Sequence, residues 1–172
     1  ATVYLAQDPH FDREVAIKVL PREFLHDPSF FERFTQEART IARLEHQNIL
    51  PVYDFGEADG IPYIVMRYMP HQSLRQRLQS APGPGLPLQE VVDVIHLVAK
   101  ALDFAHSQQV IHRDLKPGNV LLDREGNAYL SDFGIAKVIE ATMTHSGTLW
   151  VGTPSYMAPE QVRAAKPTPQ TD

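Results

Sequence analysis

Patterns of hydrophobic and polar residues divide the chain into a strand-rich part and a helix-rich part. Residues 2–6 alternate, and residues 14–20 form a second apolar run after the turn at residues 8–10, so the pair predicts a hairpin. After residues 27–29, hydrophobic residues at helical spacing predict a helix, at Phe30, Phe31, Phe34, Ala38, Ile41, Ala42 and Leu44. Residues 49–55 and 63–68 predict two more strands, joined by a turn at residues 56–60. The first part is therefore a small sheet with one helix.

The second part is predicted to be mainly helical. A short helix is expected at residues 73–79, and the Pro- and Gly-rich residues 81–87 form a break that no helix can cross. A long amphipathic helix follows, with its apolar face on Leu88, Val91, Val92, Ile95, Val98, Ala99, Leu102 and Ala105. Two short strands, residues 120–122 and 128–130, precede residues 132–160, which lack periodicity and predict one long functional loop.

Composition excludes several classes of function. The 172 residues are 43% hydrophobic, enough for a packed core in one domain or two small lobes. The formal net charge of −5 argues against a nucleic-acid-binding surface, and the lack of cysteine excludes disulfides and thiolate metal sites. No signal peptide and no apolar run of membrane-spanning length is found. We therefore expect a cytoplasmic location, no nucleic-acid partner and no membrane segment within this stretch; an anchor elsewhere in a longer protein is compatible with this.

Two short motifs carry the chemistry. Residues 112–119 read His-Arg-Asp-Leu-Lys-Pro-Gly-Asn, and Asp-Phe-Gly at residues 132–134 places a second carboxylate 18 positions after the first. A carboxylate, a nearby ammonium group and two further oxygen donors suit phosphoryl transfer from a metal–nucleotide complex. Another Asp-Phe-Gly, at residues 54–56, has no such run upstream. We interpret it as a strand-end turn with a buried Phe, so the spacing between the motifs carries the inference.

The two motifs together resemble the catalytic loop and metal-binding turn of eukaryotic-type protein kinases, in the style of the bacterial Ser/Thr members. The resemblance implies an α+β, protein-kinase-like two-lobe fold, with the N-lobe in residues 1–66 and a partial C-lobe in residues 67–172. It implies a serine/threonine protein kinase that transfers the γ-phosphoryl group of ATP to Ser and Thr hydroxyls of protein substrates, with Mg²⁺.

The resemblance also assigns roles in the reaction. Asp114 is expected to be the catalytic base and Lys116 to neutralise charge on the transferring group. Thr153 is expected to bond to both of them. Asn119 and Asp132 are expected to supply oxygen ligands to Mg²⁺.

The nucleotide is expected to lie against the first part of the chain. Lys18 lies in the middle of an apolar strand, where an unpaired ammonium group is costly, and we expect Glu37 to be its partner. By the resemblance, Lys18 holds the α- and β-phosphates and Glu37 positions it. The same resemblance assigns the adenine pocket to Val3, Ala16, Met66, Leu121 and the backbone of Arg67 and Met69.

Residues 152–160 resemble the end of a kinase activation segment, and Lys116-Pro117 favours Ser/Thr over Tyr acceptors by the same resemblance. Glu160 is expected to need an arginine downstream of this chain. A phosphate on Thr142, Thr144, Ser146 or Thr148 could bind Arg113, and autophosphorylation in trans is one source of it. Our hypothesis is that Thr144 or Thr148 is phosphorylated and raises activity.

The resemblance implies a fold truncated at both ends. The Gly-rich loop of the family falls before Thr2, and Asp172 resembles the aspartate that holds the backbone of the catalytic loop. We therefore expect this fragment alone to be inactive and poorly folded, with apolar surface left uncovered. Two alternatives stay open: a pseudokinase-type binding scaffold, and a small-molecule phosphotransferase with a kinase-like core.

Overall fold

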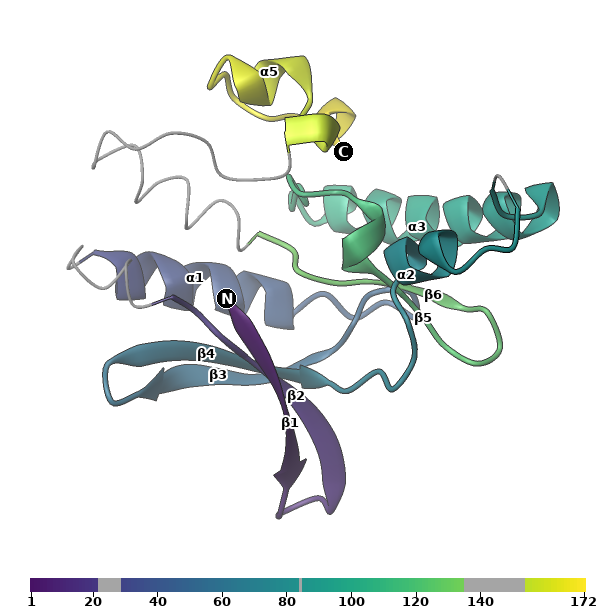
Figure 1. Ribbon diagram of the computed structural model, residues 1–172. Coiled ribbons are helices and arrows are strands. Elements are labelled where there is room, and N and C mark those ends of the chain that lie inside the picture. The colour runs from purple at the N-terminus through teal and green to yellow at the C-terminus, as the bar shows by residue number, and fades with distance from the viewer. Residues whose placement is uncertain (22–28, 84, 135–153) are drawn as a thin grey trace. The chain divides into compact units, whose positions relative to one another are not determined.

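The computed structural model describes residues 1–21, 29–83, 85–134 and 154–172 (Figure 1). These residues form two compact units. The first contains residues 1–21, 29–45 and 51–68 together with Gly134, and the second contains residues 46–50, 69–83, 85–133 and 154–172. The division into an N-lobe at residues 1–66 and a partial C-lobe at residues 67–172 stays a prediction.

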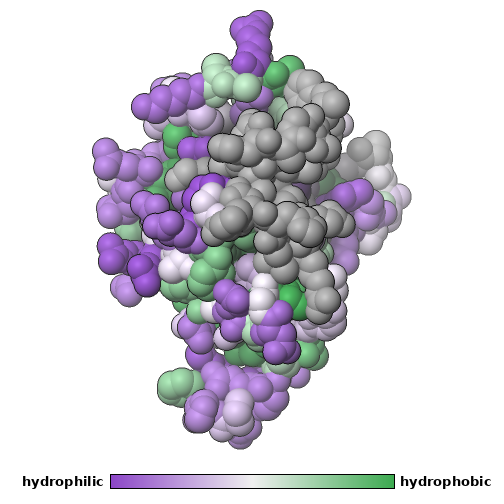
Figure 2. Space-filling view, turned by 90° about the vertical axis from the view of Figure 1, so that its left-hand side faces the viewer, coloured by the Kyte–Doolittle hydropathy of each residue, from purple (hydrophilic) through white to green (hydrophobic). Residues whose placement is uncertain are grey.

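The first unit contains an antiparallel sheet with the strand order β1-β2-β4-β3. Its strands are β1 (Thr2–Asp8), β2 (Arg13–Val19), β3 (Val52–Ala58) and β4 (Ile61–Arg67). The predicted hairpin of the first two strands is confirmed, because Thr2 pairs with Val19 and Asp8 with Arg13 at its two ends. The hairpin tip, at the bottom of Figure 2, is mainly hydrophilic with single hydrophobic residues between, which is ordinary for a protein surface.

The turn predicted at residues 56–60 is wrong, because β3 continues through Gly56 to Ala58. Only Asp59 and Gly60 connect the two strands, and both have positive φ angles, 51° and 75°, as a tight hairpin turn requires. Gly56 pairs with Tyr63, and a β-carbon on Gly56 would lie 2.8 Å from the Tyr63 hydroxyl oxygen. The glycine is therefore needed for a close cross-strand contact rather than for a turn.

The Asp-Phe-Gly at residues 54–56 consequently lies inside a strand, and its interpretation as a strand-end turn is wrong. Phe55 is half-buried and meets the ring of Phe34 edge-on, with a centroid distance of 6.4 Å. This packing gives the motif a structural role in the first unit.

Helix α1 (Phe30–Ala42) packs on the same sheet (Figure 1). Its buried residues recur at helical spacing, as the sequence predicts: Phe30, Phe34, Glu37, Ala38 and Ile41. Glu37 is the charged member of this buried face, only 9% exposed.

The second unit combines helices with a small hairpin. Its elements are α2 (Leu74–Gln79), α3 (Leu88–Ser107), the 3₁₀ helix η2 (Pro117–Asn119), strands β5 (Val120–Leu122) and β6 (Ala128–Leu130), η3 (Pro154–Tyr156), α5 (Pro159–Val162) and η4 (Pro169–Thr171). Both predicted helices and both predicted strands are confirmed. The prediction of a single loop over residues 132–160 is wrong at its end, where η3 and the start of α5 lie.

The apolar face predicted for α3 is only partly right. Val94, Ala101 and Ala105 are its buried residues, whereas Val92 and Ile95 remain 51% and 62% exposed. The helix therefore carries uncovered apolar surface, as expected. The expectation that this chain folds poorly on its own stays a prediction.

Residues 46–50 extend the β5–β6 hairpin of the second unit. The Leu130 N–H donates to the Asn48 carbonyl at 2.8 Å, and the Leu50 N–H donates to the Leu130 carbonyl at 2.9 Å. These bonds hold β6 directly upstream of residues 131–133. The fold thus brings a strand end next to the loop at residues 112–119.

Candidate active site

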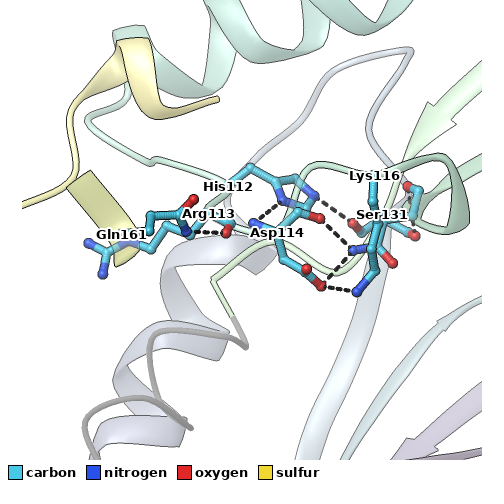
Figure 3. Close-up of polar contacts among 7 residues, drawn as sticks. His112, Arg113, Asp114, Lys116, Ser131 and Gln161 are labelled. Atoms are coloured by element: carbon cyan, nitrogen blue, oxygen red, sulfur yellow. Dashed lines mark hydrogen bonds and ion pairs between the residues drawn. The ribbon is translucent and has the colours of Figure 1, made fainter. Parts of the chain in front are cut away.

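Asp114 is the centre of a cluster of short polar contacts in the second unit. The Lys116 ammonium Nζ lies 2.6 Å from Oδ2 of Asp114. The side-chain amide of Asn119 donates to the Asp114 carbonyl at 2.8 Å and to its Oδ2 at 3.0 Å. The ion pair is drawn in Figure 3. One carboxylate therefore holds the ammonium and amide groups that the sequence assigned to the same reaction.

The local sequence explains how Asn119 returns toward Asp114. Pro117 begins the 3₁₀ turn η2, where its fixed φ suits a first helical position and its missing N–H costs no bond. The Asn119 N–H donates back to the Lys116 carbonyl at 2.9 Å, and the residue is only 5% exposed. The turn and the burial hold the amide against Asp114.

The backbone before Asp114 is held by Asp172. The N–H groups of His112 and Arg113 donate to its Oδ2 and Oδ1, each at 2.7 Å. The Asp172 side chain is fully buried, and Nε2 of His106 lies 2.9 Å from Oδ2. The expectation that Asp172 holds the catalytic loop's backbone is confirmed. Arg113 has a φ of 71°, a left-handed conformation that a non-glycine residue keeps only under such constraint.

His112 connects this loop to the end of β6. Its Nδ1 accepts from the Asp114 N–H at 3.2 Å, so Nε2 carries the proton and donates to the Ser131 carbonyl at 2.8 Å. The ring is fully buried and lies 4.6 Å from the Phe133 ring, between centroids. Burial lowers the pKa of His112, which keeps the imidazole neutral near pH 7.

Asp132 follows Ser131, which is hydrogen-bonded to Asn119. Ser131 donates its N–H and its hydroxyl to the Asn119 carbonyl, at 2.9 and 3.1 Å. Asp132 follows with a φ of 66°. Carboxylate and amide oxygens are the donors that Mg²⁺ prefers, and the bonds from Nδ2 of Asn119 leave its Oδ1 as the available ligand atom. The two residues fit a magnesium site completed by a nucleotide.

The strand register of the first unit groups the residues assigned to the nucleotide. Val3 pairs with Lys18 and Ala16 pairs with Met66, and paired residues point to the same face of a sheet. Val3, Ala16, Lys18 and Met66 therefore share one face. Arg67 ends β4, whereas Met69 and Leu121 belong to the second unit. The pairing of Lys18 with Glu37 stays a prediction.

The end of the Asp-Phe-Gly motif lies against Glu37. Gly134 has a φ of 62°. A β-carbon on this residue would lie 2.6 Å from Oε1 of Glu37, which is too close for any side chain. The Glu37 side chain therefore occupies the space that a side chain at residue 134 would need.

The protein kinase domain family matches the whole chain, residues 1–172. The chain belongs to this family. Serine/threonine-protein kinase PrkC of Bacillus subtilis is 41% identical over 173 residues, which cover 100% of this chain and 26% of the relative. Serine/threonine-protein kinase PknB of Mycobacterium leprae is 39% identical over 166 residues, 94% of this chain and 26% of the relative. The chain thus spans about a quarter of the length of these curated relatives.

The kinase fold is also shown by solved structures. The Mycobacterium tuberculosis PknI kinase domain superposes with a TM-score of 0.80 at 37% sequence identity, over 99% of this chain and 61% of that one. The prediction of a bacterial-type Ser/Thr kinase catalytic-domain fragment with an α+β fold is therefore confirmed. The protein kinase family uses ATP and a divalent metal. Within the described residues, no helix has the length and hydrophobicity needed to cross a membrane.

Some predicted site residues of this kinase chain lie outside the described residues. They are Thr153 and the candidate phosphate acceptors Thr142, Thr144, Ser146 and Thr148. Glu160, expected to pair with a downstream arginine, accepts from the Thr171 hydroxyl at 2.6 Å. That bond lowers the pKa of Glu160.

Three residues of the site were missed by the sequence reasoning: His106, Ser131 and Gln161. Ser131 contacts the loop and His106 contacts Asp172, which holds the loop, through bonds between distant segments that leave no local signal. Gln161 had a signal, because a glutamine two residues after Pro159 occupies a common helix-capping position.

Proposed function

We propose that the protein carrying this chain is a serine/threonine protein kinase that transfers the γ-phosphoryl group of Mg-ATP to protein hydroxyls. The single observation that carries the proposal is the contact of Lys116 and Asn119 with one carboxylate, that of Asp114. Membership of the protein kinase family and the names of the relatives support it.

Each residue of the cluster has a distinct role in the proposal. Asp114 orients the acceptor hydroxyl and receives its proton. Lys116 stabilises negative charge on the group in transfer, and Asn119 with Asp132 would hold Mg²⁺. When bound, the Mg-ATP complex supplies the phosphoryl group and the charge neutralisation for its departure.

The residues on one face of the first sheet would bind the nucleotide. Lys18, positioned by Glu37, would hold the α- and β-phosphates. The adenine ring would lie against apolar side chains and the backbone at the end of β4: Val3, Ala16, Met66, Arg67, Met69 and Leu121. Ala16 and Met66, each 7% exposed, give this face a buried apolar base.

Protein Ser and Thr side chains are the proposed acceptors. Thr153 would bond to Asp114 and Lys116 and shape the site for a small hydroxyl. Autophosphorylation in trans at Thr144 or Thr148 would supply a phosphate for Arg113. A double alanine variant with full activity and normal phosphate incorporation would overturn that part.

The test is transfer from radiolabelled ATP by the full-length protein. A generic protein acceptor and small alcohols are offered in parallel, and labelled residues are identified after hydrolysis. We expect label on Ser and Thr, with turnover reduced roughly 10²–10⁴-fold in Asp114→Asn. Asp103→Asn, the same change at an exposed site on α3, is the matched control. Label on alcohols alone would favour the small-molecule enzyme, and ATP binding without transfer would favour the scaffold.

A further inference from the structure

Gln161 connects helix α5 to the backbone of the catalytic loop. Its side-chain Nε2 donates to the Arg113 carbonyl oxygen at 2.6 Å (Figure 3), and its Oε1 accepts from the Ala158 N–H at 3.0 Å. Both ends of one amide are therefore used. The acceptor bond caps α5, and the donor bond reaches a residue 48 positions away in the sequence.

The accepting carbonyl belongs to the peptide group that joins Arg113 to Asp114. The N–H of the same peptide group donates to Nδ1 of the buried His112 ring at 3.2 Å. One peptide plane is thus held on its oxygen by Gln161 and on its nitrogen by His112. Two bonds on opposite edges restrict rotation of this plane, and that rotation would swing the Asp114 side chain.

This restraint acts at Arg113, whose backbone conformation is unfavourable. Arg113 has a φ of 71°, which is unfavourable for a side chain other than glycine's. Asp172 holds its N–H side at 2.7 Å, and Gln161 holds its carbonyl side. Without Gln161, the strained residue would be held from one side only and could relax toward an ordinary conformation.

We propose that Gln161 is a positioning residue, which orients the Asp114 carboxylate through the Arg113–Asp114 peptide group. The inference rests on the proposed kinase function, since it assigns Gln161 to the same reaction. It also couples the end of the activation segment to the catalytic base, because α5 begins within residues 152–160. Small rotations of a catalytic group reduce turnover strongly, even without any change in substrate contacts.

Gln161→Glu separates the two roles of the side chain. It keeps an oxygen for the Ala158 N–H, so the cap of α5 survives, but it places a carboxylate against the Arg113 carbonyl. Gln161→Met keeps the length of the side chain and removes both bonds. If Gln161 acts on Asp114, Gln161→Glu is the more damaging change. If it serves α5 alone, Gln161→Met is the more damaging one.

Gln76→Glu is the matched control. Gln76 occupies the same capping position in α2, where its Oε1 accepts from the Ser73 N–H at 2.8 Å. The chemical change and the helix position are therefore the same, while the bonds accepted by Gln76 Oε1 stay within the Ser73–Gln76 turn. This variant reports what the substitution does to a helix cap alone.

The experiment measures kcat and KM for ATP in the full-length protein, per molecule that binds a fluorescent ATP analogue, together with amide hydrogen exchange over residues 112–119. We expect Gln161→Glu to lower kcat about tenfold or more with KM within about twofold, and to speed exchange at the Asp114 N–H. Gln76→Glu should change neither quantity.

Normal kcat and unchanged exchange in Gln161→Glu would overturn the proposal, as would a greater loss in Gln161→Met. If the wild-type protein binds ATP without transfer, the proposed function fails. The rate of hydrogen exchange at the Asp114 N–H then still shows whether Gln161 restrains the peptide group.

Discussion

Gly134 and Glu37 lie in direct contact: a β-carbon on Gly134 would be 2.6 Å from Oε1 of Glu37 and 2.9 Å from its Cγ. The glycine also has a φ of 62°. Two independent constraints, close approach and backbone conformation, therefore exclude a side chain at this position. Since Glu37 is buried on α1, its side chain has little room to move away.

We expect Gly134→Ala to lower the free energy of unfolding by about 2–4 kcal/mol, the sum of left-handed backbone strain and overpacking against Glu37. Urea denaturation of the full-length protein measures the change. Two other glycines separate the contributions. Gly126→Ala has the backbone strain alone, at a φ of 85° in open space, and Gly83→Ala has neither constraint. An effect at Gly134 no larger than at Gly126 would contradict the contact with Glu37.

The polar cluster at Asp114 could be predicted from the sequence, because its members are close along the chain. Asp114, Lys116 and Asn119 span six residues, and the turn begun by Pro117 folds them together. The role of Asp172 could be predicted only through the family resemblance, since no local pattern indicates a contact 60 residues away. The residues that hold the loop rather than act in it could largely not be predicted from local sequence, as His106 and Ser131 show.

Two other predictions are wrong for different reasons: glycine occurs both in turns and in strands, and helical periodicity does not show which apolar residues are covered. The sequence favours a turn at Gly56, whereas Gly56 is a strand residue that leaves room for the Tyr63 ring. On α3, periodicity indicated a broad apolar face but gave no information on which part is covered. Val94, which is not part of the predicted face, is buried, whereas Ile95, which is part of it, is exposed. That difference depends on neighbouring elements and is absent from the helix's own sequence.

Lys116→Met should lower kcat by roughly 10²-fold with little change in KM for ATP, because it removes the cation next to Asp114. The radiolabel assay of the full-length protein measures both constants. Lys100→Met, at an exposed position of α3, makes the same chemical change away from the cluster and should keep wild-type turnover. Equal turnover in the two variants would remove Lys116 from the reaction.

The buried His112 should make the protein less stable as the pH falls below neutral. Its pKa is lowered in the folded state, so below the unfolded value of about 6.5 the unfolded chain binds a proton that the folded chain does not. Stability therefore rises with pH across this window, by up to about 1.4 kcal/mol per pH unit. Urea denaturation at several pH values between 5.5 and 8, all at the same ionic strength, measures the slope.

His112→Phe keeps a buried ring and removes the titrating group, so the slope should be smaller in this variant. It should also be less stable at pH 8, because the N–H of Asp114 and the carbonyl of Ser131 lose their partner. His10→Gln, at an exposed turn, is the control and should keep the wild-type slope. A wild-type slope in His112→Phe would show that other groups cause the pH dependence.

Asp123 should stabilise the β5–β6 turn through its ionised form. Its Oδ1 accepts from the N–H groups of Glu125 and Asn127, and its Oδ2 accepts from the Asn127 amide and the Tyr129 hydroxyl. Burial raises the pKa of Asp123, but these hydrogen bonds outweigh burial and the net pKa is lowered. A lowered carboxyl pKa contributes stability that is present above the unfolded pKa and is lost as the pH falls through the folded one.

Asp123→Asn should therefore lower the free energy of unfolding by about 1–2 kcal/mol at pH 7, because its amide group cannot accept from the Asn127 amide and the Tyr129 hydroxyl as the carboxylate does. The difference from the wild-type protein should begin to shrink as the pH falls below the unfolded carboxyl pKa of about 4, and it should vanish once the pH passes the lowered pKa of the folded carboxyl. Urea denaturation at pH 7 and at acidic pH measures it, with the exposed Asp103→Asn as control. A difference that stays the same across this range would mean that the shape of the turn, and not the charge of Asp123, provides the stability.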